Sequence, residues 1–422
     1  MRSDRLFFAL IILSLAAGVA NAAGHIDAWT QITPQGTEVR AAVAGDACPV
    51  LDVDGTPQPM SLRAAADADF PVRLCQALVP EHAKAVRVDG QPVPAPVTQP
   101  RRILIFGDTG CRLKGQAVQD CNDPRAWPFA LIARHAASRH PDLVIHVGDY
   151  YYRETPCPAG DAGCAGSPYG DRWPTWKSEF FDPAAPLLAT TPWVFVRGNH
   201  ESCSRGGPGW FRLLDAAEQP QTCPASSAPY RLGLGDLNLY ILDSADTEDT
   251  DAPAAAVAAF SAQLDALQPD LASHPGWILT HRPFWGLTPV ARLGPLGPLE
   301  IALNKTEQVA VRGHDLSAVS MVVSGHIHHF AAYTFGPNRP AQLIAGTGGD
   351  VGEPADTPRM RAESAQIDSM DARGFSFDRF GYLMLERRGA DWVGDFRDID
   401  DRLIAVCRLR GRALACGPTM RR

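Results

Sequence analysis

The chain has 422 residues, of which 45% are hydrophobic and 20% charged, and its formal net charge is −8. This composition excludes a disordered chain, which would carry too few apolar residues to form a core, and the length suggests about two or three domains. The acidic balance disfavours nucleic acid as a partner, because phosphate backbones select basic surfaces.

Residues 1–22 are typical of a secretory leader peptide. Arg2 and Arg5 precede an apolar run that ends at Val19, and small residues at Ala20 and Ala22 follow. The alternative is an uncleaved membrane anchor, but the run is shorter than the roughly 20 residues that a spanning helix needs. We therefore predict cleavage after Ala22, a secreted or periplasmic protein, and no stable membrane anchor.

The next segment, 23–97, is predicted to be a small β domain that ends in a linker. Residues 23–90 contain short alternating apolar segments broken by Gly, Pro and Asp, which is typical of strands and turns. Four prolines within 91–100 then predict a stiff, extended connection. A domain boundary near residue 98 follows from this change in composition.

From residue 101, apolar runs alternate with helical patterns, which predicts βαβ units and a largely buried sheet for a domain over 98–400. The expected helices span about 127–140, 173–189 and 253–267. Residues 380–409 are expected to form a closing antiparallel pair, and 401–422 a disulfide-tied tail. The expected strands are 103–106, 143–147, 193–196, 237–242, 277–280, 319–324 and 341–345.

Ten cysteines are unusual for a cytosolic chain of this length, so in an exported protein they predict disulfides. A zinc site is disfavoured because no Cys-x-x-Cys pattern occurs. Nearest-neighbour pairing would close five local loops, although the sequence alone leaves the connectivity open. These neighbours are Cys48 and Cys75, Cys111 and Cys121, Cys157 and Cys164, Cys203 and Cys223, and Cys407 and Cys416.

Metal-binding side chains follow the ends of successive predicted strands. Each one alone is more often a turn residue or a structural histidine, but ligands of open α/β sheets bind outside the carboxyl ends of the strands. Together they therefore predict a metal site. These residues are Asp108, Asp149, Asn199, His281, His326 and His328.

Their spacing suits two metal ions. Asp149 and Tyr152 can be brought together by one turn, and His326 and His328 would share a face of an extended segment, so that each could hold one ion. Asp149, flanked by both groups, is the natural bridge. Two cations about 3.5–4 Å apart would clamp a phosphoryl group and activate water.

The residues in this order resemble the metallophosphoesterase superfamily, and specifically its purple acid phosphatase branch. Where the general superfamily has Asp-x-His in the first block, this chain has Asp108-Thr109-Gly110, and Tyr152 replaces the missing histidine as in the purple branch. The blocks read Gly107-Asp108, Gly148-Asp149-Tyr150-Tyr151-Tyr152, Gly198-Asn199-His200-Glu201, His281 and Gly325-His326-Ile327-His328.

The resemblance implies a four-layer α/β/β/α sandwich and two metal sites. It assigns Asp108, Asp149, Tyr152 and His328 to Fe³⁺, and Asp149, Asn199, His281 and His326 to a divalent ion, Fe²⁺, Zn²⁺ or Mn²⁺. A phenol with a pKa near 10 binds metal best as a phenolate, which independently favours a hard trivalent ion beside Tyr152. His281 is preferred to His274 and His314 because it closes the apolar strand.

The implied activity is that of an acid phosphatase, in which a metal-bound hydroxide attacks a small-molecule phosphate monoester. His200 would orient the phosphate and protonate the leaving alkoxide. A phosphodiesterase with the same ligands is the nearest alternative, and a catalytically silent phosphoester-binding protein is an alternative of another class. Assays with monoesters and diesters separate these alternatives.

Three other features are expected to be structural. The acidic stretch 243–251 lacks the spacing of a calcium loop and is predicted to be a solvated loop. Residues 346–349 are rich in glycine, and we expect them to let a strand end pass close to the site. His146 is expected to be a buried core histidine.

Overall fold

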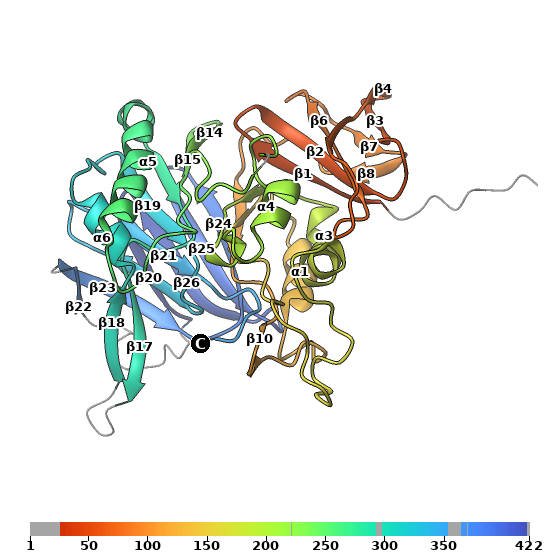
Figure 1. Cartoon of the computed structure of the whole chain (residues 1–422). Coiled ribbons are helices and arrows are strands. Elements are labelled where there is room, and N and C mark those ends of the chain that lie inside the picture. The colour runs from red at the N-terminus through yellow and green to blue at the C-terminus, as the bar shows by residue number, and fades with distance from the viewer. Residues whose placement is uncertain (1–25, 221, 293–297, 353–363, 369, 420–422) are drawn as a thin grey trace, which may run out of the picture.

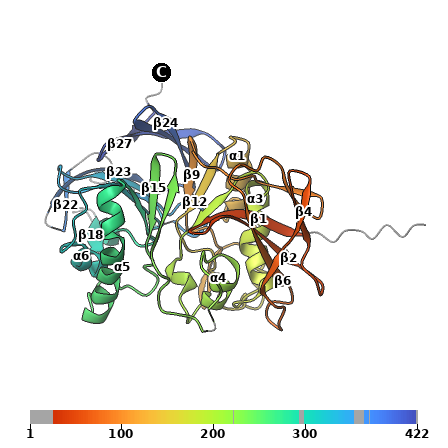
Figure 2. The same ribbon diagram turned by 90° about the horizontal axis from the view of Figure 1, so that it is seen from above.

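The computed structural model describes residues 26–220, 222–292, 298–352, 364–368 and 370–419, so the expected leader and its cleavage position lie outside the described residues. Two large β-sheets pack against each other at the centre of the molecule, and helices cover the outer side of each (Figure 1). The view from above shows the helices of the two outer layers on opposite sides (Figure 2).

The first sheet has eleven strands, and its central strands β9, β12 and β13 run parallel. The side chains of β12 and β13 are buried throughout, as expected for strands that are covered on both faces. In order across the sheet the strands are β27 (Ala413–Pro418), β26 (Leu403–Arg410), β25 (Asp391–Asp398), β24 (Gly381–Arg388), β9 (Arg102–Phe106), β12 (Leu143–His146), β13 (Trp193–Phe195), β1 (Asp27–Thr33), β2 (Gly36–Val43), β6 (Arg73–Val79) and β5 (Ser61–Ala64).

The second sheet has eight strands, and β15, β16, β19 and β21 form its parallel centre. Its inner face contributes Leu239, Leu279 and Val323 to the core shared with the first sheet. In order across the sheet the strands are β14 (Tyr230–Leu234), β15 (Leu237–Ile241), β16 (Gly276–Leu279), β19 (Val319–Ser324), β21 (Ala341–Ala345), β20 (Phe330–Thr334), β23 (Met370–Phe377) and β22 (Ser364–Ile367).

The helices form the two outer layers. The first sheet is covered by α1 (Phe129–Ala137), α2 (Trp173–Trp176), the π-helical turn η1 (Lys177–Phe181), α3 (Asp182–Leu188) and α4 (Gly207–Leu213). The second sheet is covered by α5 (Ala254–Ser273) and α6 (Lys305–Val311). Two sheets between two helical layers confirm the expected α/β/β/α fold, in which each amphipathic element buries its apolar face against the next layer.

The N-terminal region is rich in β-structure and joins the first sheet. Strand β1 pairs with β13 in parallel at Gln31 and Trp193, and β2, β6 and β5 continue the sheet. Arg40, fully buried on β2, donates to the carbonyls of Leu213, the last residue of α4, and of Asp215, at 2.7 Å each. Strands β4 (Thr56–Pro59), β3 (Val50–Val53), β7 (Val86–Val88) and β8 (Gln91–Val93) form a separate small sheet.

The strands and helices expected between 101 and 345 are present, with two differences in the helices. The helix expected over 253–267 extends to Ser273, and the one over 173–189 is interrupted by η1. Strands β14, β20, β22 and β23 and helices α4 and α6 escaped prediction. So did two short hairpins, β10 (Leu113–Lys114) with β11 (Ala117–Val118) and β17 (Gly286–Arg292) with β18 (Pro298–Leu303).

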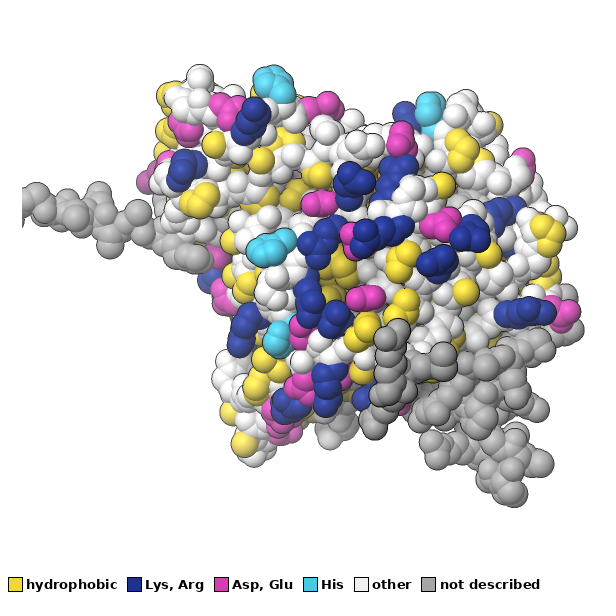
Figure 3. All heavy atoms as spheres, turned by 180° about the vertical axis from the view of Figure 1, so that it is seen from behind, with side chains coloured by type: hydrophobic (Ala, Val, Ile, Leu, Met, Phe, Trp, Pro, Cys, Tyr) yellow, Lys and Arg dark blue, Asp and Glu magenta, His cyan; other side chains and the backbone are white. Residues whose placement is uncertain are grey.

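All five nearest-neighbour cysteine pairs form disulfides. Within the described part of the chain, no helix is both long and apolar enough to cross a membrane. The face turned away from the viewer of Figure 1 has a central band of basic side chains with acidic side chains among them (Figure 3). Surface ion pairs such as Arg125–Asp400 and Arg410–Asp391 show the same mixing of charges.

Candidate metal centre

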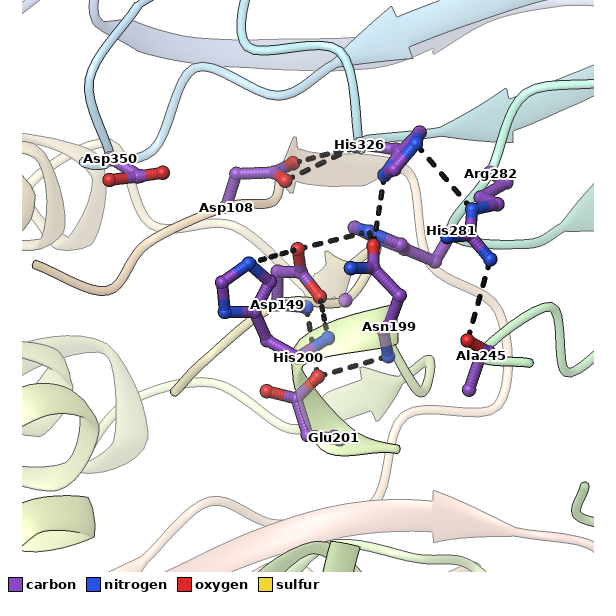
Figure 4. Close-up of polar contacts among 12 residues, drawn as sticks. Asp108, Asp149, Asn199, His200, Glu201, Ala245, His281, Arg282, His326 and Asp350 are labelled. Carbon is purple, nitrogen blue, oxygen red and sulfur yellow. Dashed lines mark hydrogen bonds and ion pairs between the residues drawn. The ribbon is translucent and has the colours of Figure 1, made fainter. Parts of the chain in front are cut away.

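The sequence-predicted site residues converge at one edge of the two central sheets. Asp108 follows β9, and Asp149 and Tyr152 follow β12; the 3₁₀ turn η2 (Asn199–Glu201) comes just after β13. His281 follows β16 and the two remaining histidines follow β19, both in the second sheet. The carboxyl ends of parallel strands therefore bring side chains from both sheets to one point (Figure 4).

The first cluster consists of Asp108, Asp149, Tyr152 and His328, and the phenol is at its centre. The Tyr152 hydroxyl lies 3.1 Å from Asp108 Oδ1, 2.9 Å from Asp149 Oδ2 and 3.0 Å from His328 Nε2. His328 Nε2 is also 3.3 Å from Asp108 Oδ1. Two carboxylates, a phenol and an imidazole thus point at a common position.

The second cluster consists of Asp149, Asn199, His281 and His326. The Asn199 side-chain oxygen lies 3.0 Å from His281 Nε2 and 2.9 Å from His326 Nδ1. Asp149 Oδ2 lies 3.2 Å from His281 Nε2, so Asp149 belongs to both clusters. Within each cluster the histidine and carboxylate ligand atoms lie within 4.8 Å of one another, close enough to hold one ion.

Backbone strain accompanies this convergence. Asp108, Asp149 and His326 have left-handed backbone conformations, with φ of 58°, 61° and 70°. Such conformations cost free energy for non-glycine residues and occur mainly where the surrounding structure enforces them, often at functional sites. The expectation of an extended segment for His326 and His328 is therefore wrong: the chain bends there, and this bend directs the two rings to different clusters.

Two buried carboxylates, whose role the sequence did not reveal, hold the loop that carries Asp149 and Tyr152. Glu201 accepts hydrogen bonds from the backbone N–H groups of Asp149 at 3.1 Å and Tyr150 at 2.8 Å. Glu179, on η1, accepts from the N–H groups of Cys111 at 2.8 Å and Tyr152 at 2.9 Å. Burial raises the pKa of Glu201 to about 8 and that of Glu179 to about 7.

The pKa values of the cluster residues are shifted by burial and by the charges of their neighbours. Burial, with Asp149 and Asp108, raises the pKa of Tyr152 well above its usual value. Burial alone would lower the pKa of His281, but Asp149 outweighs it and raises this pKa to about 9. Burial alone would likewise raise the pKa of Asp149, but His281 and His200 hold it well below its usual range. A buried set of anions and imidazole lone pairs suits positive ions.

His200 borders the clusters. Its ring lies 3.8 Å from the Tyr152 ring, centroid to centroid, and its Nε2 is 3.9 Å from Asp149 Oδ2. The other ring nitrogen lies 3.0 Å from the Tyr151 carbonyl and 3.1 Å from Glu154 Oε1. Burial lowers the pKa of His200 despite the opposing effects of Asp149 and Glu154.

The acidic stretch 243–251 is not the solvated loop that its composition predicted. Asp243 is buried and pairs with Arg197 at 3.0 Å, while Asp249 lies 2.9 Å from His326 Nε2. These contacts depend on elements far apart in the sequence, which explains why a local pattern missed them.

Other expectations about structural residues hold. His146 is buried, with its Nε2 at 2.9 Å from the Thr109 hydroxyl. The Gly348 N–H bonds to the Gly107 carbonyl at 2.9 Å, so the glycine-rich segment passes directly along the Asp108 loop. Of the alternative histidines, His314 pairs with Asp265 on α5, and His274 follows the end of that helix; neither belongs to the clusters.

A cavity of about 380 Å³ adjoins the first cluster. His328 forms part of its wall, together with Arg125, Arg379 and Phe380. A second cavity, of about 410 Å³, is lined by Arg205, whose guanidinium lies 2.8 Å from His200. Space is therefore available next to the first cluster at His328, whereas the second cavity is related to His200 only through Arg205.

Comparisons with known proteins agree with this geometry. The family model for calcineurin-like phosphoesterases matches residues 101–330. No curated protein matches the sequence. Two solved structures share the fold over 93% of this chain: purple acid phosphatase PPD1 from yellow lupin (Lupinus luteus) seeds and PhoD.

The two structures are similar to this chain in fold rather than in sequence. The lupin enzyme is 15% identical, with a TM-score of 0.50 and 74% of its own chain covered. PhoD is 13% identical, with a TM-score of 0.59 and 92% of its chain covered. The family model spans more than half of the 422 residues, and it includes every strand end that carries a cluster residue. The chain therefore belongs to the calcineurin-like phosphoesterase family, and it is a phosphoesterase with two adjoining candidate metal sites.

Proposed function

We propose that this protein is an exported acid phosphatase of the purple acid phosphatase type, which hydrolyses small-molecule phosphate monoesters at a binuclear metal centre. The observation that carries the proposal is the position of the Tyr152 phenol, within 3.1 Å of both Asp108 and Asp149. A phenolate among two carboxylates is an unfavourable grouping unless a strongly charged cation joins it.

The donor atoms fit two different ions. The first cluster offers hard anionic oxygens, which suit Fe³⁺, with Tyr152 as a phenolate. The second cluster offers one carboxylate, one amide oxygen and two imidazoles, which suit Fe²⁺, Zn²⁺ or Mn²⁺. Asp149 would bridge the two ions.

Gly110 supports the assignment of Tyr152. A Cβ atom at this position would lie 2.5 Å from Tyr152 Cδ2 and 2.7 Å from Glu179 Oε1. The phenol ring therefore occupies the space beside residue 110, where the general superfamily has a histidine. Any side chain larger than that of glycine at residue 110 would collide with the Tyr152 ring, so a tyrosine ring in this place requires glycine at residue 110.

The bound ions would supply positive charge that polarises the phosphoryl group and acidifies a water molecule. The protein itself contributes the orientation of the ligands and a proton donor. His200 stands beside both clusters, and Glu154 fixes its ring through Nδ1 at 3.1 Å. Its Nε2 side would donate the proton to the departing alkoxide.

Export is supported by the five disulfides, which persist in oxidising compartments. The band of basic side chains in Figure 3 is mixed with acidic groups and the net charge is −8, so the overall field attracts no anion strongly. Attraction of a phosphate ester would then depend on the two ions locally. We place the protein outside the cytoplasm, secreted or periplasmic.

The decisive experiment is a visible spectrum combined with metal analysis of the purified protein and of Tyr152→Phe. A phenolate–iron charge-transfer band in the parent that disappears in the variant supports the proposal. Tyr151→Phe is the matched control, because Tyr151 is equally buried but packs on Trp176, outside both clusters. A protein that binds two ferric ions without such a band contradicts the assignment of Tyr152.

A kinetic comparison then identifies the reaction. Aryl phosphate monoesters should be hydrolysed with higher kcat/KM than the corresponding diesters. Preference for the diester would indicate a phosphodiesterase with the same ligands, and metal-loaded protein without turnover would indicate a phosphoester-binding protein.

A further inference from the structure

Each histidine of the His326–His328 pair has its own aspartate–arginine pair on the ring nitrogen that faces away from the clusters. We propose that Asp249 and Asp350 are positioning residues that fix the tautomers of these two rings, so that His326 presents Nδ1 and His328 presents Nε2. The inference rests on the proposed binuclear centre and concerns residues that no metal would touch.

Asp350 acts on the first cluster. Its Oδ2 lies 3.2 Å from His328 Nδ1, while Nε2 of the same ring faces the Tyr152 hydroxyl at 3.0 Å. Arg112 holds this carboxylate, with its Nε at 3.2 Å from Oδ1 and 3.1 Å from Oδ2. The Asp350 side chain is fully buried, so its charge is balanced by Arg112 rather than by water.

Asp249 acts on the second cluster. Its Oδ1 lies 2.9 Å from His326 Nε2, and Nδ1 of that ring faces the Asn199 oxygen at 2.9 Å. Arg282 supports this carboxylate, with its Nε at 3.0 Å from Oδ1. The same Nε is 3.5 Å from His326 Nε2, and the two side chains lie next to each other in Figure 4.

The chemistry of imidazole explains why the carboxylates matter. A neutral ring has one N–H and one lone pair, and an acceptor at one nitrogen places the hydrogen there. Asp350, together with the Val351 carbonyl, therefore leaves the lone pair of His328 on Nε2, and Asp249 leaves that of His326 on Nδ1. The two histidines use opposite nitrogens, so free tautomer exchange would misdirect each of them.

The two aspartates are positioned by different parts of the tertiary structure. The glycine-rich segment 346–349 runs along the Asp108 loop and ends in Asp350, whose N–H bonds to the Asp108 carbonyl at 2.9 Å (Figure 4). Asp249 lies in the loop after β15, where its carbonyl accepts from the Lys305 N–H at 3.0 Å. Asp350 is thus held by the backbone of a residue of the first cluster, whereas Asp249 is held by the backbone at the start of α6.

The two aspartates differ in how completely they control their histidine. His328 Nδ1 is hydrogen-bonded to the Val351 carbonyl at 3.0 Å. Asp350 adds its charge at 3.2 Å, and Arg112 Nη2 lies 3.4 Å from the same nitrogen. For His326 Nε2, Asp249 is the acceptor among the residues that the structure describes. We therefore expect the larger effect from loss of the Asp249 charge, although that side chain is 35% exposed.

The test compares Asp249→Asn and Asp350→Asn with the parent protein by chelator competition and metal analysis. Each isosteric variant should bind one of its two ions about 10–100-fold more weakly, as is typical when the partner of a metal-ligating histidine is lost. The visible band of Tyr152 should change in Asp350→Asn and persist in Asp249→Asn. Asp246→Asn, an exposed position in the same loop as Asp249, is the matched control and should bind both ions as the parent does.

The outcomes separate the inference from the proposed function. A parent protein that binds no pair of ions overturns the binuclear centre, whereas variants that bind both ions with parental affinity overturn the role of the aspartates alone. If Asp350→Asn fails to fold, Arg112→Gln tests the same contact. The Arg112 side chain is 32% exposed, so its replacement should be tolerated, and it removes the ion pair that holds Asp350 while leaving the Asp350 carboxylate in the structure. Unchanged affinity of Arg112→Gln for the ion of the first cluster would also contradict the inference.

Discussion

The two clusters share Asp149 and lie side by side, yet they are built from opposite kinds of donors. The first cluster combines two carboxylates and a phenol with one imidazole, whereas the second combines one carboxylate with an amide and two imidazoles. Anionic oxygens select a hard, highly charged ion, and neutral nitrogens select a divalent one. Under the proposed function, the two adjoining positions would therefore hold different ions.

The largest expected effect follows from removing the residue that the clusters share. Asp149→Asn should lose both ions together, because each cluster loses its common carboxylate. The fall in kcat should then exceed the roughly 10²–10³-fold cost of losing one charge-stabilising group. Metal analysis and steady-state kinetics check this, with Asp246→Asn as the control; retention of one full equivalent of metal would show that Asp149 serves only one cluster.

Substitution of His200 should separate catalysis from metal binding. His200→Ala leaves both donor sets intact, so the metal content should stay parental while kcat falls by about 10²–10⁴-fold. The fall should be smaller for aryl esters, whose leaving group needs less protonation, than for alkyl esters. An equal fall for both kinds of ester would argue against a proton donor.

The disulfides offer a way to destabilise separately the loop after Asp108 and the loop after His200. Cys111–Cys121 braces the loop after Asp108, and Cys203–Cys223 braces the loop after His200. Replacing either pair by serine should lower the free energy of unfolding by about 2–3 kcal/mol. Loss of the Cys111–Cys121 pair should weaken binding of the ion in the first cluster more than binding of the ion in the second, as chelator competition can measure. Equal weakening of the binding of both ions would show that the two loops act as one unit.

The smallest expected effect concerns Asp171, which connects α2 to α4 in the helical layer on the first sheet. Asp171 accepts from Trp176 Nε1 at 2.7 Å and from the Gly209 N–H at 2.9 Å, and burial raises its pKa to about 6. The folded-state pKa is above the unfolded value because burial disfavours the charged carboxylate. Asp171 is therefore neutral in both states well below about pH 4, and the cost of burying its charge lowers the unfolding free energy as the pH rises through about 6.

Asp171→Asn removes this titration. Over that range, the unfolding free energy of the parent should fall relative to that of the variant by about 1 kcal/mol, since partial exposure reduces the effect. Denaturant titrations of both proteins at several pH values measure the difference, with Asp246→Asn as the control. Parallel pH profiles would contradict the raised pKa of Asp171.

Much of the site was predictable from local sequence. Strand-end residues such as Asp108 and Asn199 were identified because an apolar run ends just before each of them, and the carboxyl ends of strands meet at one edge. His326 and His328 were predicted to serve different ions, although the bend at His326, rather than an extended segment, separates them. Their partners Asp249 and Asp350 escaped prediction because nothing in a loop's own pattern shows which distant ring it will meet.

The sequence by itself therefore determined the donor types and their order along the chain, because both depend on local spacing. It offered nearest-neighbour pairing of the cysteines only as one possibility, and the structure decided it. Only the tertiary structure decided that Glu179 would hold the Asp108 and Tyr152 loops together and that each ring would present a particular nitrogen. These features arise where segments from the two sheets converge. Their geometry depends on long-range packing and on buried charges that must find partners, which no local pattern contains.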